Sequence, residues 1–424
     1  MPRRDLALHT VSVTTPIEIP DDLRDHLHDV YRHLHAHPEL SMAEHRTARF
    51  VSAEMTDLGY TVTPCTETGL VAVLANGEGP VVAFRADMDA LPLPEKTGLD
   101  YASTARGVLP DGTDVPVMHA CGHDTHITCA IGTAALLARD LTAWAGTVIF
   151  IYQPAEETAA GAQAMLDDDV WGKSLPTGQR PDVVYSQHVW PGRTGTIDIT
   201  PGPAMAMADS WKVTVHGRGG HGSRPEGTID PVVLAAHMIV RIQSIVSREV
   251  AAQSATVITV ATISAGLKEN VIPGSAEFTL NVRTLDAAVR DHVLAALRRV
   301  MLAEAEASAA PEPTIEELYR FPLLVNDEAL TAEAVAVLGE VLGPDKVAQI
   351  PPSMGSEDFG HLPQAIDVPG VFWFFGGLPD EVVDGDEPVP SIHSSLFAPV
   401  IEPTLSTGVR AAYAMLSHRL QPGA

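Results

Sequence analysis

Cysteine and basic residues are both scarce in this chain of 424 residues. Its three cysteines are an odd number that allows no disulfide framework, which favours a reducing compartment. Lysine and arginine together number 27 against 54 acidic residues, so the formal net charge is −27. Nucleic acids and anionic membrane surfaces attract clustered basic side chains, so we expect neither as a partner.

Long hydrophobic runs are also lacking. The most apolar stretches have the length of a strand or carry polar residues at helical spacing, so we expect no membrane span. The N-terminal segment MPRRDLALHTVSVTT has two arginines without a following apolar run of signal-peptide length. Together with the cysteine count, this predicts a cytoplasmic protein. The hydrophobic content of 45% is typical of a globular protein, and the length predicts two domains.

Helices and short buried strands alternate over the first half of the chain. Apolar residues recur at helical spacing over three ranges: 22–35, 44–58 and 126–139. Apolar or β-branched runs of strand length occupy four others: 70–74, 81–85, 147–152 and 183–189. This alternation predicts an α/β domain with a mostly parallel sheet covered by helices on both faces. In such sheets, functional side chains gather at the carboxyl ends of the strands.

The order of elements changes near residue 205. From there the pattern reads strand, helix, strand, strand, helix, strand, over 210–215, 230–248, 255–263, 276–282, 285–307 and 314–319. That β-α-β-β-α-β order is the ferredoxin-like arrangement. The α/β alternation then resumes. We therefore predict one α/β domain, residues 19–204 and 319–424, interrupted by an inserted α+β domain, residues 205–318.

Cys121 and His123 stand on either side of Gly122 in the run MHACGHD. A thiolate and an imidazole on one tight turn favour zinc over magnesium or calcium, with manganese as the alternative. Gly122 lets the backbone bend so that both side chains can point to one centre. The rival interpretation is a nucleophilic Cys–His pair. That mechanism gives no use to the two adjacent carboxylates that follow the next expected strand.

Those carboxylates are Glu156 and Glu157. Because successive side chains of an extended chain point to opposite faces, the two should have different roles. One would bind a metal ion, and the other would act as general acid and base in a hydrolysis. The residues by themselves do not decide which is which.

Two further histidines, His188 and His393, lie at the end of an expected strand and in a polar loop. Together with Cys121, His123 and one glutamate they make five ligands. That number suits a centre of two metal ions with open positions for water, as metal-assisted hydrolysis requires.

Five more polar residues are candidates for supporting roles. Asp87 and Asp89 follow an expected strand and would orient or bridge the metal ligands. His221, flanked by glycines in the inserted domain, would donate a hydrogen bond to the oxyanion of a tetrahedral intermediate. Asn270 and Arg283 in the same domain would anchor the substrate, the guanidinium binding a carboxylate.

A group of N-terminal histidines is a different case. They crowd one amphipathic helix that stops at a proline, and we predict that they form its exposed face. The group comprises His26, His28, His33, His35 and His37. We therefore expect none of them in the candidate site.

With these residues identified, the chain resembles the M20 metallopeptidase family, and within it the aminoacylase-like amidohydrolases that include hippurate hydrolases and plant auxin-conjugate hydrolases. The resemblance runs nearly end to end, through HLHAHPELSMAEH, FRADMDALP, MHACGHDTH, QPAEE, GGHGSRP, ENVIPG, GSEDF and IHSS. The order and spacing of these segments make it specific. The run TAAGA after the paired glutamates departs from the more glycine-rich run that relatives often carry.

This resemblance implies a catalytic α/β domain with an inserted lid domain that mediates dimerisation, and so a homodimer. It also implies two divalent metal ions per chain, with ligands matching Cys121, His123, Glu157, His188 and His393. Glu156 matches the family's general base, and Asn270 resembles a substrate-contacting lid residue. His221 matches the lid histidine, which in dimeric members can come from the neighbouring subunit.

The implied reaction is metal-dependent hydrolysis of the amide bond of N-acyl amino acids, releasing a carboxylic acid and a free amino acid. Cysteine at the first ligand position separates the chain from the dipeptidase and carboxypeptidase branches, which use an aspartate there. The alternatives are a metal-dependent dipeptidase or aminopeptidase, and a catalytically silent metal-binding homologue. An intact Glu156 counts against the silent homologue, because mere binding has no need of an unligated carboxylate.

Overall fold

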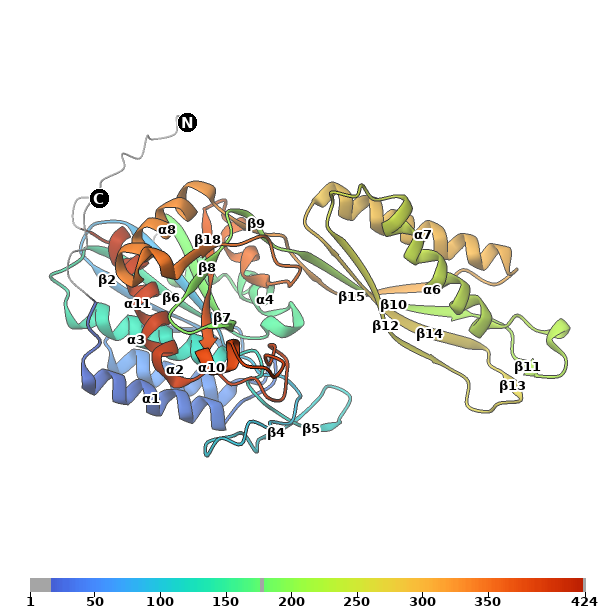
Figure 1. Ribbon diagram of the computed structural model, residues 1–424, viewed down its shortest axis with the longest axis horizontal. Coiled ribbons are helices and arrows are strands. Elements are labelled where there is room, and N and C mark those ends of the chain that lie inside the picture. The colour runs from blue at the N-terminus through green and yellow to red at the C-terminus, as the bar shows by residue number, and fades with distance from the viewer. Residues whose placement is uncertain (1–16, 176–178, 422–424) are drawn as a thin grey trace. The chain divides into compact units, whose positions relative to one another are not determined.

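The computed structural model describes residues 17–175 and 179–421, which form two compact units (Figure 1). Among the described residues, the first unit contains those up to Gly202 together with Val325–Pro351 and the residues from Phe359 to the end of the described chain. The second contains Pro203–Leu324 and Pro352–Asp358. The chain passes between the units through the short strands β9 (Gly202–Met205) and β16 (Leu324–Asn326) and at both ends of Pro352–Asp358.

An eight-stranded sheet lies at the centre of the first unit. Its spatial order is β1 (Thr61–Cys65), β2 (Gly69–Asn76), β6 (Gly146–Gln153), β3 (Val81–Asp87), β7 (Val183–Arg193), β18 (Gly370–Leu378), β8 (Ile197–Ile199) and β17 (Val347–Gln349). Strands β6, β3, β7 and β18 run parallel, whereas β1, β2 and β8 pair antiparallel with their inner neighbours. The prediction of a mostly parallel sheet is confirmed.

Both faces of this sheet are covered. Every residue of β3 and β18 is buried, and successive side chains of a strand point to opposite faces. The longer helices of the unit are α1 (Asp21–Ala36), α2 (His45–Asp57), α3 (His123–Arg139), α8 (Glu328–Leu342) and α11 (Ile401–Arg419). The shorter ones are α4 (Gly161–Asp167), α5 (Val170–Ser174), α9 (His361–Gln364) and α10 (Asp380–Val383). Strands β4 (Arg106–Val108) and β5 (Asp114–Pro116) pair outside the main sheet.

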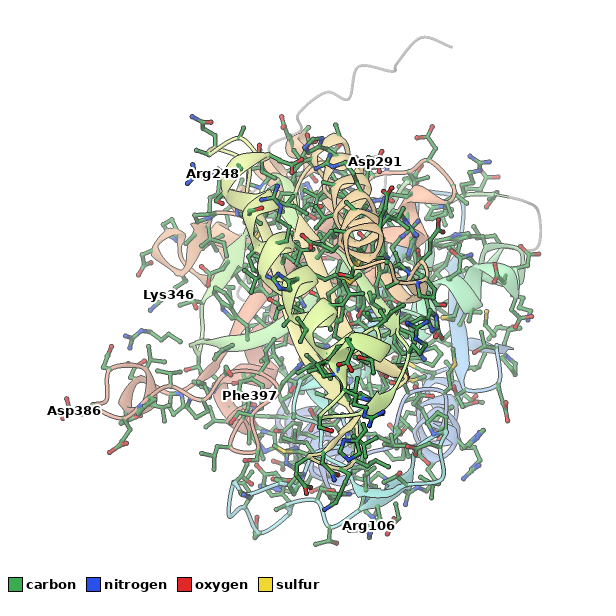
Figure 2. All side chains as sticks on the ribbon, turned by 90° about the vertical axis from the view of Figure 1, so that its right-hand side faces the viewer. Arg106, Arg248, Asp291, Lys346, Asp386 and Phe397 are labelled. Carbon is green, nitrogen blue, oxygen red and sulfur yellow. The ribbon has the colours of Figure 1, made fainter. Side chains whose placement is uncertain are left out.

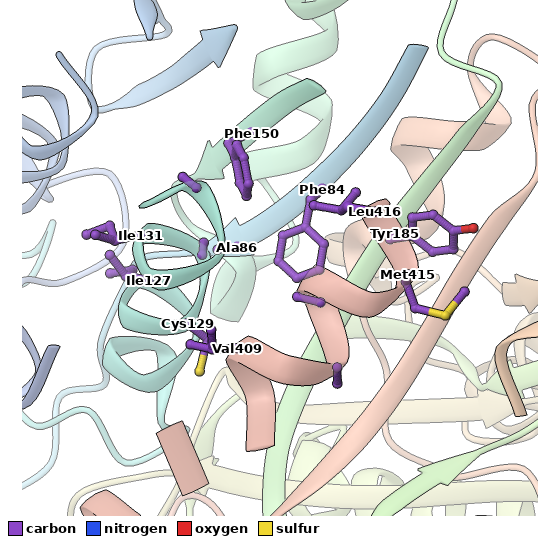
Figure 3. Packing of buried hydrophobic residues seen from close by; sticks show 14 of the residues in the cluster. Phe84, Ala86, Ile127, Cys129, Ile131, Phe150, Tyr185, Val409, Met415 and Leu416 are labelled. Carbon is purple, nitrogen blue, oxygen red and sulfur yellow. The ribbon is translucent and has the colours of Figure 1, made fainter. Parts of the chain in front are cut away.

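Helices α3 and α11 pack against each other and against the central strands (Figure 3). Phe84 of β3 and Tyr185 of β7 belong to the same buried cluster as Ile127 of α3 and Val409 of α11. Burial of each such side chain contributes about 1.5–3 kcal/mol. Tertiary packing therefore holds α3 in place, and with it the residues at its N-terminus.

The second unit has the ferredoxin-like order of elements. Its four-stranded antiparallel sheet has the order β12 (Thr256–Ala265), β14 (Ser275–Thr284), β10 (Met207–His216) and β15 (Thr314–Phe321). Buried and half-exposed residues alternate along β14, so one face of the sheet is covered.

That cover consists of α6 (Pro231–Arg248) and α7 (Ala287–Ala307). Figure 2 shows the two helices with their side chains, with Arg248 at the end of α6 and Asp291 near the start of α7. A small separate sheet pairs β11 (Gly220–His221) with β13 (Val271–Ile272). In the described part of the chain, no helix combines the length and the apolar character needed to cross a membrane.

His35 contradicts the prediction that the N-terminal histidines are exposed, because it is fully buried. It lies four residues after the buried Tyr31, on the apolar side of α1. Its Nδ1 is 2.7 Å from Asp124 Oδ2, and its Nε2 is 3.0 Å from Glu95 Oε1. Burial alone would lower the pKa of His35, but the two carboxylates raise it to about 9. His26, His33 and His37 are exposed as predicted, and His28 is half-buried.

We expect replacement of His35 by glutamine to destabilise the protein more at pH 6 than at pH 10. The folded-state pKa of about 9 exceeds the ordinary value of 6.5, so the imidazolium stabilises the fold fully below pH 6.5. That stabilisation, on the order of 3 kcal/mol, is lost as the pH rises through about 9. Urea unfolding of wild type and His35→Gln at both pH values measures the difference.

A control for this experiment is His26→Gln on the same helix, where the side chain is 48% exposed. Its difference from wild type should be small at both pH values. A His35→Gln effect that stays constant or grows with pH would contradict the charged state assigned to His35.

Candidate functional site

The structure brings the five predicted ligand residues together at one end of the central strands. The sulfur of Cys121 lies 3.4 Å from His188 Nε2 and 3.3 Å from His393 Nε2. Glu157 Oε1 lies 3.3 Å from His393 Nε2 and 4.0 Å from His123 Nε2. Ligand atoms within 4.8 Å of one another form the groups Cys121–His123–His188 and Cys121–Glu157–His393. Cys121 is common to both groups.

The backbone around Cys121 and His123 explains how both reach one centre. Gly122 has φ 82°, a left-handed conformation that favours glycine, and it precedes the first residue of α3. A Cβ atom on Gly122 would lie 2.4 Å from a methyl carbon of Val189, so glycine is also needed for space. His393 has φ 64°, and its N–H donates to the Ala120 carbonyl at 2.8 Å. A left-handed non-glycine residue stores strain of the kind found at functional sites.

His188 lies inside β7 rather than at its end, because the strand continues to Arg193. Its Nδ1 donates to the carbonyl of Val189 at 2.5 Å. The Nε2 lone pair therefore points toward Cys121.

Glu156 and Glu157 are not on an extended chain. They begin a 3₁₀ turn, Glu156–Thr158, after Ala155 with φ 53°. Both backbone N–H groups donate to the carboxylate of Asp89, each at 3.1 Å. The two glutamate side chains therefore do not point in different directions because of strand alternation. Their directions are set by the turn that Asp89 holds. Glu156, Glu157 and His123 form a further group of close ligand atoms.

Asp87 and Asp89 both face His123. Asp89 Oδ1 lies 3.2 Å from His123 Nδ1, and Asp87 Oδ2 lies 3.7 Å from His123 Nε2. Burial would raise the pKa of Asp87, but the guanidinium of Arg85, 2.6 Å away, and His123 hold it well below its usual range. Burial would lower the pKa of His123, but the carboxylates of Asp87 and Asp89 raise it to about 10. The surroundings of this imidazole are strongly negative and favour a cation.

These residues fit divalent metal ions. His123 Nε2 and Glu157 Oε1 are buried and have no hydrogen-bond partner among the described residues. Buried polar atoms are rarely left unpaired, and a metal ion would pair both. Burial and then the carboxylates of Glu157 and Glu156 raise the pKa of the Cys121 thiol. A thiolate at this place therefore needs a bound cation, and a coordinated thiol is deprotonated.

The same raised pKa weighs against the nucleophilic Cys–His pair. A nucleophilic cysteine needs a lowered pKa, which comes from nearby positive charge. Burial and then His126 hold the pKa of the neighbouring His188 well below its ordinary value, so this imidazole is neutral. Among the described residues, burial and the negative charge of Glu157 and Glu156 keep the Cys121 thiol protonated.

The other predicted residues belong to the second unit. His221 is exposed, and its Nδ1 accepts hydrogen bonds from the N–H of Ser223 at 3.1 Å and from its hydroxyl at 2.8 Å. A backbone N–H can only donate, so Nδ1 accepts, and the ring has its N–H at Nε2 and can donate from there. The carbonyl of Asn270 accepts from the N–H of Gly222 at 2.8 Å, which places Asn270 beside this turn.

Arg283 is engaged within its own unit. Its Nη1 donates to the Met354 carbonyl at 2.7 Å, and its Nε donates to Asn281 Oδ1 at 2.9 Å. The guanidinium thus ties the segment Pro352–Asp358 to β14. Its role as a substrate anchor stays a prediction.

Sequence reasoning missed several buried polar residues around the site. Glu44 accepts from the backbone N–H of Ala155 at 2.9 Å and from the Thr68 hydroxyl at 2.7 Å, which supports the turn of the glutamates. Burial and then Asp89 raise the pKa of Glu44 to about 7. His126 is fully enclosed between Asp87 and the backbone of β7. Its helical spacing from His123 in GHDTH was the available signal.

The model of peptidase family M20/M25/M40 matches residues 83–416 of this chain. An N-acetyl-L-cysteine deacetylase of Bacillus subtilis is 35% identical over 86% of this chain and 82% of its own length. Thermostable carboxypeptidase 2 of Saccharolobus solfataricus is 32% identical over 84% of this chain and 86% of its own length.

A solved structure is also similar throughout. The Bacillus subtilis YXEP protein, a dinuclear metal binding peptidase from the M20 family, superposes with a TM-score of 0.74 and 29% identity. The match covers 95% of this chain and 99% of that protein. The clustered ligand atoms and these relationships agree, and the chain belongs to peptidase family M20/M25/M40.

Proposed function

We propose that this protein is a metal-dependent amidohydrolase that cleaves the amide bond of N-acyl amino acids. The products are a carboxylic acid and a free amino acid. The observation that carries the proposal is the pair of ligand groups sharing Cys121, with the buried carboxylate of Glu156 beside them. The deacetylase relative, named for an N-acetyl amino acid, supports this substrate class.

Two divalent ions would occupy the site, zinc in first place and manganese as the alternative, because the donor set mixes sulfur, nitrogen and oxygen. The residues that would hold them are Cys121, His123, Glu157, His188 and His393. When bound, such ions acidify water and polarise a carbonyl group. Asp87 and Asp89 would orient the ring of His123.

Glu156 would act as the general base and acid. It would take a proton from the attacking water and deliver it to the nitrogen of the leaving amine. We assign Glu157 as the ligand because its Oε1 faces both His123 and His393. Glu156 is 5% exposed, so bulk water does not compete for its proton.

His221 would stabilise the oxyanion of the tetrahedral intermediate through its Nε2–H. The exposed ring and its contacts with Ser223 support a donor that is free to meet a substrate. Asn270, beside the same turn, and Arg283 would contact the substrate on this unit.

A carboxypeptidase activity is the second candidate, because one relative carries that name. The chemistry is related, since the C-terminal residue of a peptide is itself an amino acid acylated on nitrogen. A dipeptidase or aminopeptidase would differ in needing a free amino group on the substrate.

We also propose a homodimer formed through the second unit. Strand β12 is an edge of the four-stranded sheet and is largely exposed. Ile263 on this strand and Leu267 just after it are exposed apolar residues. An exposed edge strand can pair with another chain, and we propose that the same strand of a second copy covers it. The three free cysteines are buried and form no disulfide, which supports a reducing, cytoplasmic location.

The substrate class is tested by comparing kcat/KM for N-acetyl and N-benzoyl amino acids with that for unblocked dipeptides. We expect the acylated amino acids to be the better substrates. Treatment with a chelator should abolish turnover while the circular dichroism spectrum is kept, and zinc or manganese should restore it. Preference for unblocked dipeptides would show that the enzyme is a dipeptidase or aminopeptidase. Full activity in protein shown by elemental analysis to lack metal would exclude the metal-dependent mechanism.

The two adjacent glutamates should respond differently to the same substitution. Glu156→Gln should keep the metal content and lower kcat by at least ~10²–10⁴-fold, the contribution of general acid–base catalysis. Glu157→Gln should lower the metal content, because it removes a charged ligand. Elemental analysis and steady-state kinetics on both variants measure this, each serving as the other's control. The exchanged pattern would reverse the two assignments.

His221→Ala should leave the metal content unchanged and lower kcat by ~10²-fold or more, the scale of a lost oxyanion donor. Ser223→Ala, which removes only a neighbour of the ring, should have a much smaller effect. Mixed dimers of His221→Ala and Glu156→Gln subunits then test which chain supplies the histidine. Recovered activity means that His221 serves the partner's site. Unrecovered activity in dimers that have exchanged subunits means that it serves its own.

A further inference from the structure

The pairing between strands β3 and β7 ends before the predicted ligand His188 on β7. The pairing of the two strands extends from Val82↔Val183 to Arg85↔Ser186, whereas β18 continues along β7 past Val189. In a strand, the N–H and the C=O of one residue point to the same side. The peptide groups of Val189 that β18 does not use therefore need partners other than a strand.

Two imidazole rings supply those partners. His126 Nε2 accepts the N–H of Val189 at 2.8 Å. The carbonyl of Val189 accepts from His188 Nδ1 at 2.5 Å. The ring centroids are 4.4 Å apart, and both rings are almost fully buried. Val189 thus connects His126 on α3 to the predicted ligand His188.

These contacts fix the proton of His126. Because the N–H of Val189 can only donate, His126 Nε2 must present a lone pair, and the proton lies on Nδ1. Nδ1 donates to Asp87 Oδ1 at 2.5 Å. The other oxygen of Asp87 accepts from Arg85 Nη1 at 2.6 Å. The buried chain of hydrogen bonds therefore runs from Arg85 through Asp87, His126 and Val189 to His188.

The same contacts argue against His126 as a metal ligand. Asp87, His123 and His126 lie close enough to form a ligand group of their own. A metal ion on His126 Nε2 would take the lone pair from the N–H of Val189 and leave that group buried and unpaired, which is destabilising. Both ring nitrogens are already used in hydrogen bonds.

We propose that His126 is a positioning residue for the metal centre. By accepting the N–H of Val189, it positions this residue, whose carbonyl keeps the proton of His188 on Nδ1. His188 Nε2 is then free to face the centre, 3.4 Å from the sulfur of Cys121. This inference rests on the proposed metal-dependent function.

Substitutions of His126 separate its two contacts. The amide of His126→Gln reaches about as far as Nε2 and can accept the N–H of Val189. The shorter amide of His126→Asn reaches only the place of Nδ1 and keeps the contact with Asp87. Zinc affinity of the full chain, measured by competition with a chromophoric chelator, should fall ~10–100-fold in His126→Asn, the usual scale for a residue that orients a ligand. The loss in His126→Gln should be smaller, and both variants should bind as many ions as wild type at saturating zinc.

Leu137→Ala is the matched control, because Leu137 is a fully buried residue of α3 outside this chain of contacts. It should lower the urea midpoint without changing the zinc Kd. Loss of one ion at saturating zinc in both His126 variants would make His126 a ligand. An unchanged zinc Kd with a lowered urea midpoint would reduce its role to folding. Equal losses of zinc affinity in His126→Gln and His126→Asn would show that the contact with Val189 does not position the metal centre.

Nitrogen NMR of wild-type protein with isotopically labelled histidine tests the proton positions without any substitution. In the metal-free protein, the hydrogen-bond partners predict a proton on Nδ1 and a lone pair on Nε2 in both His126 and His188. Added zinc should shift the Nε2 resonance of His188 as a coordinated nitrogen, and His126 should not show this shift. A proton on Nε2 of His126, or coordination there, overturns the proposal. Wild-type protein that binds neither zinc nor manganese would refute the metal-dependent function. The metal-free spectrum would still show which nitrogen of each ring carries the proton.

Discussion

The buried carboxylate of Asp89 is the group on which the geometry of the site depends. Its oxygens accept from the backbone N–H groups of Glu156 and Glu157 and from the hydroxyl of Ser41 at 2.6 Å, and Oδ1 lies 3.2 Å from His123 Nδ1. One side chain two residues after the end of β3 thus places both the turn with the two glutamates and a histidine of α3. A carboxylate with several donors keeps its charge even when it is buried.

Such a concentration of buried charge has to be balanced by cations. Arg85 pairs with Asp87 inside the sheet, and His35 pairs with Asp124 at the first turn of α3, both without solvent exposure. Removing one partner of a buried pair leaves an uncompensated charge, which is strongly destabilising. His123 and Glu157 also lie near groups of opposite charge, but the buried atoms His123 Nε2 and Glu157 Oε1 have no hydrogen-bond partner among the described residues. Metal binding and folding of this end of the sheet are therefore coupled.

Most helices and strands could be predicted from the sequence, because the residue patterns that indicate them are local. Helical and strand periodicity located the main elements within a few residues, and the rule that sites gather at strand ends located Asp87, Asp89 and Glu156. What it missed depends on contacts between distant segments. The burial of His35 follows from Asp124 and Glu95, and the turn after β6 follows from Asp89 rather than from strand alternation. Likewise, nothing in the pattern of α3 indicates that His126 meets the backbone of Val189.

The two units hold their predicted site residues with different firmness. The predicted ligands of the first unit are mostly buried, and hydrogen bonds fix the ring of His188 and the backbone of Glu157, as an ion needs before substrate arrives. His221 instead lies exposed on a two-residue strand, held by Ser223 and by the pairing with β13. In the role proposed for it, His221 would donate a hydrogen bond only to the negative charge that develops during the reaction. It would therefore not stabilise the enzyme before substrate binds. Such a residue belongs on a segment that can meet the substrate after binding, because catalysis gains only from contacts that strengthen in the transition state.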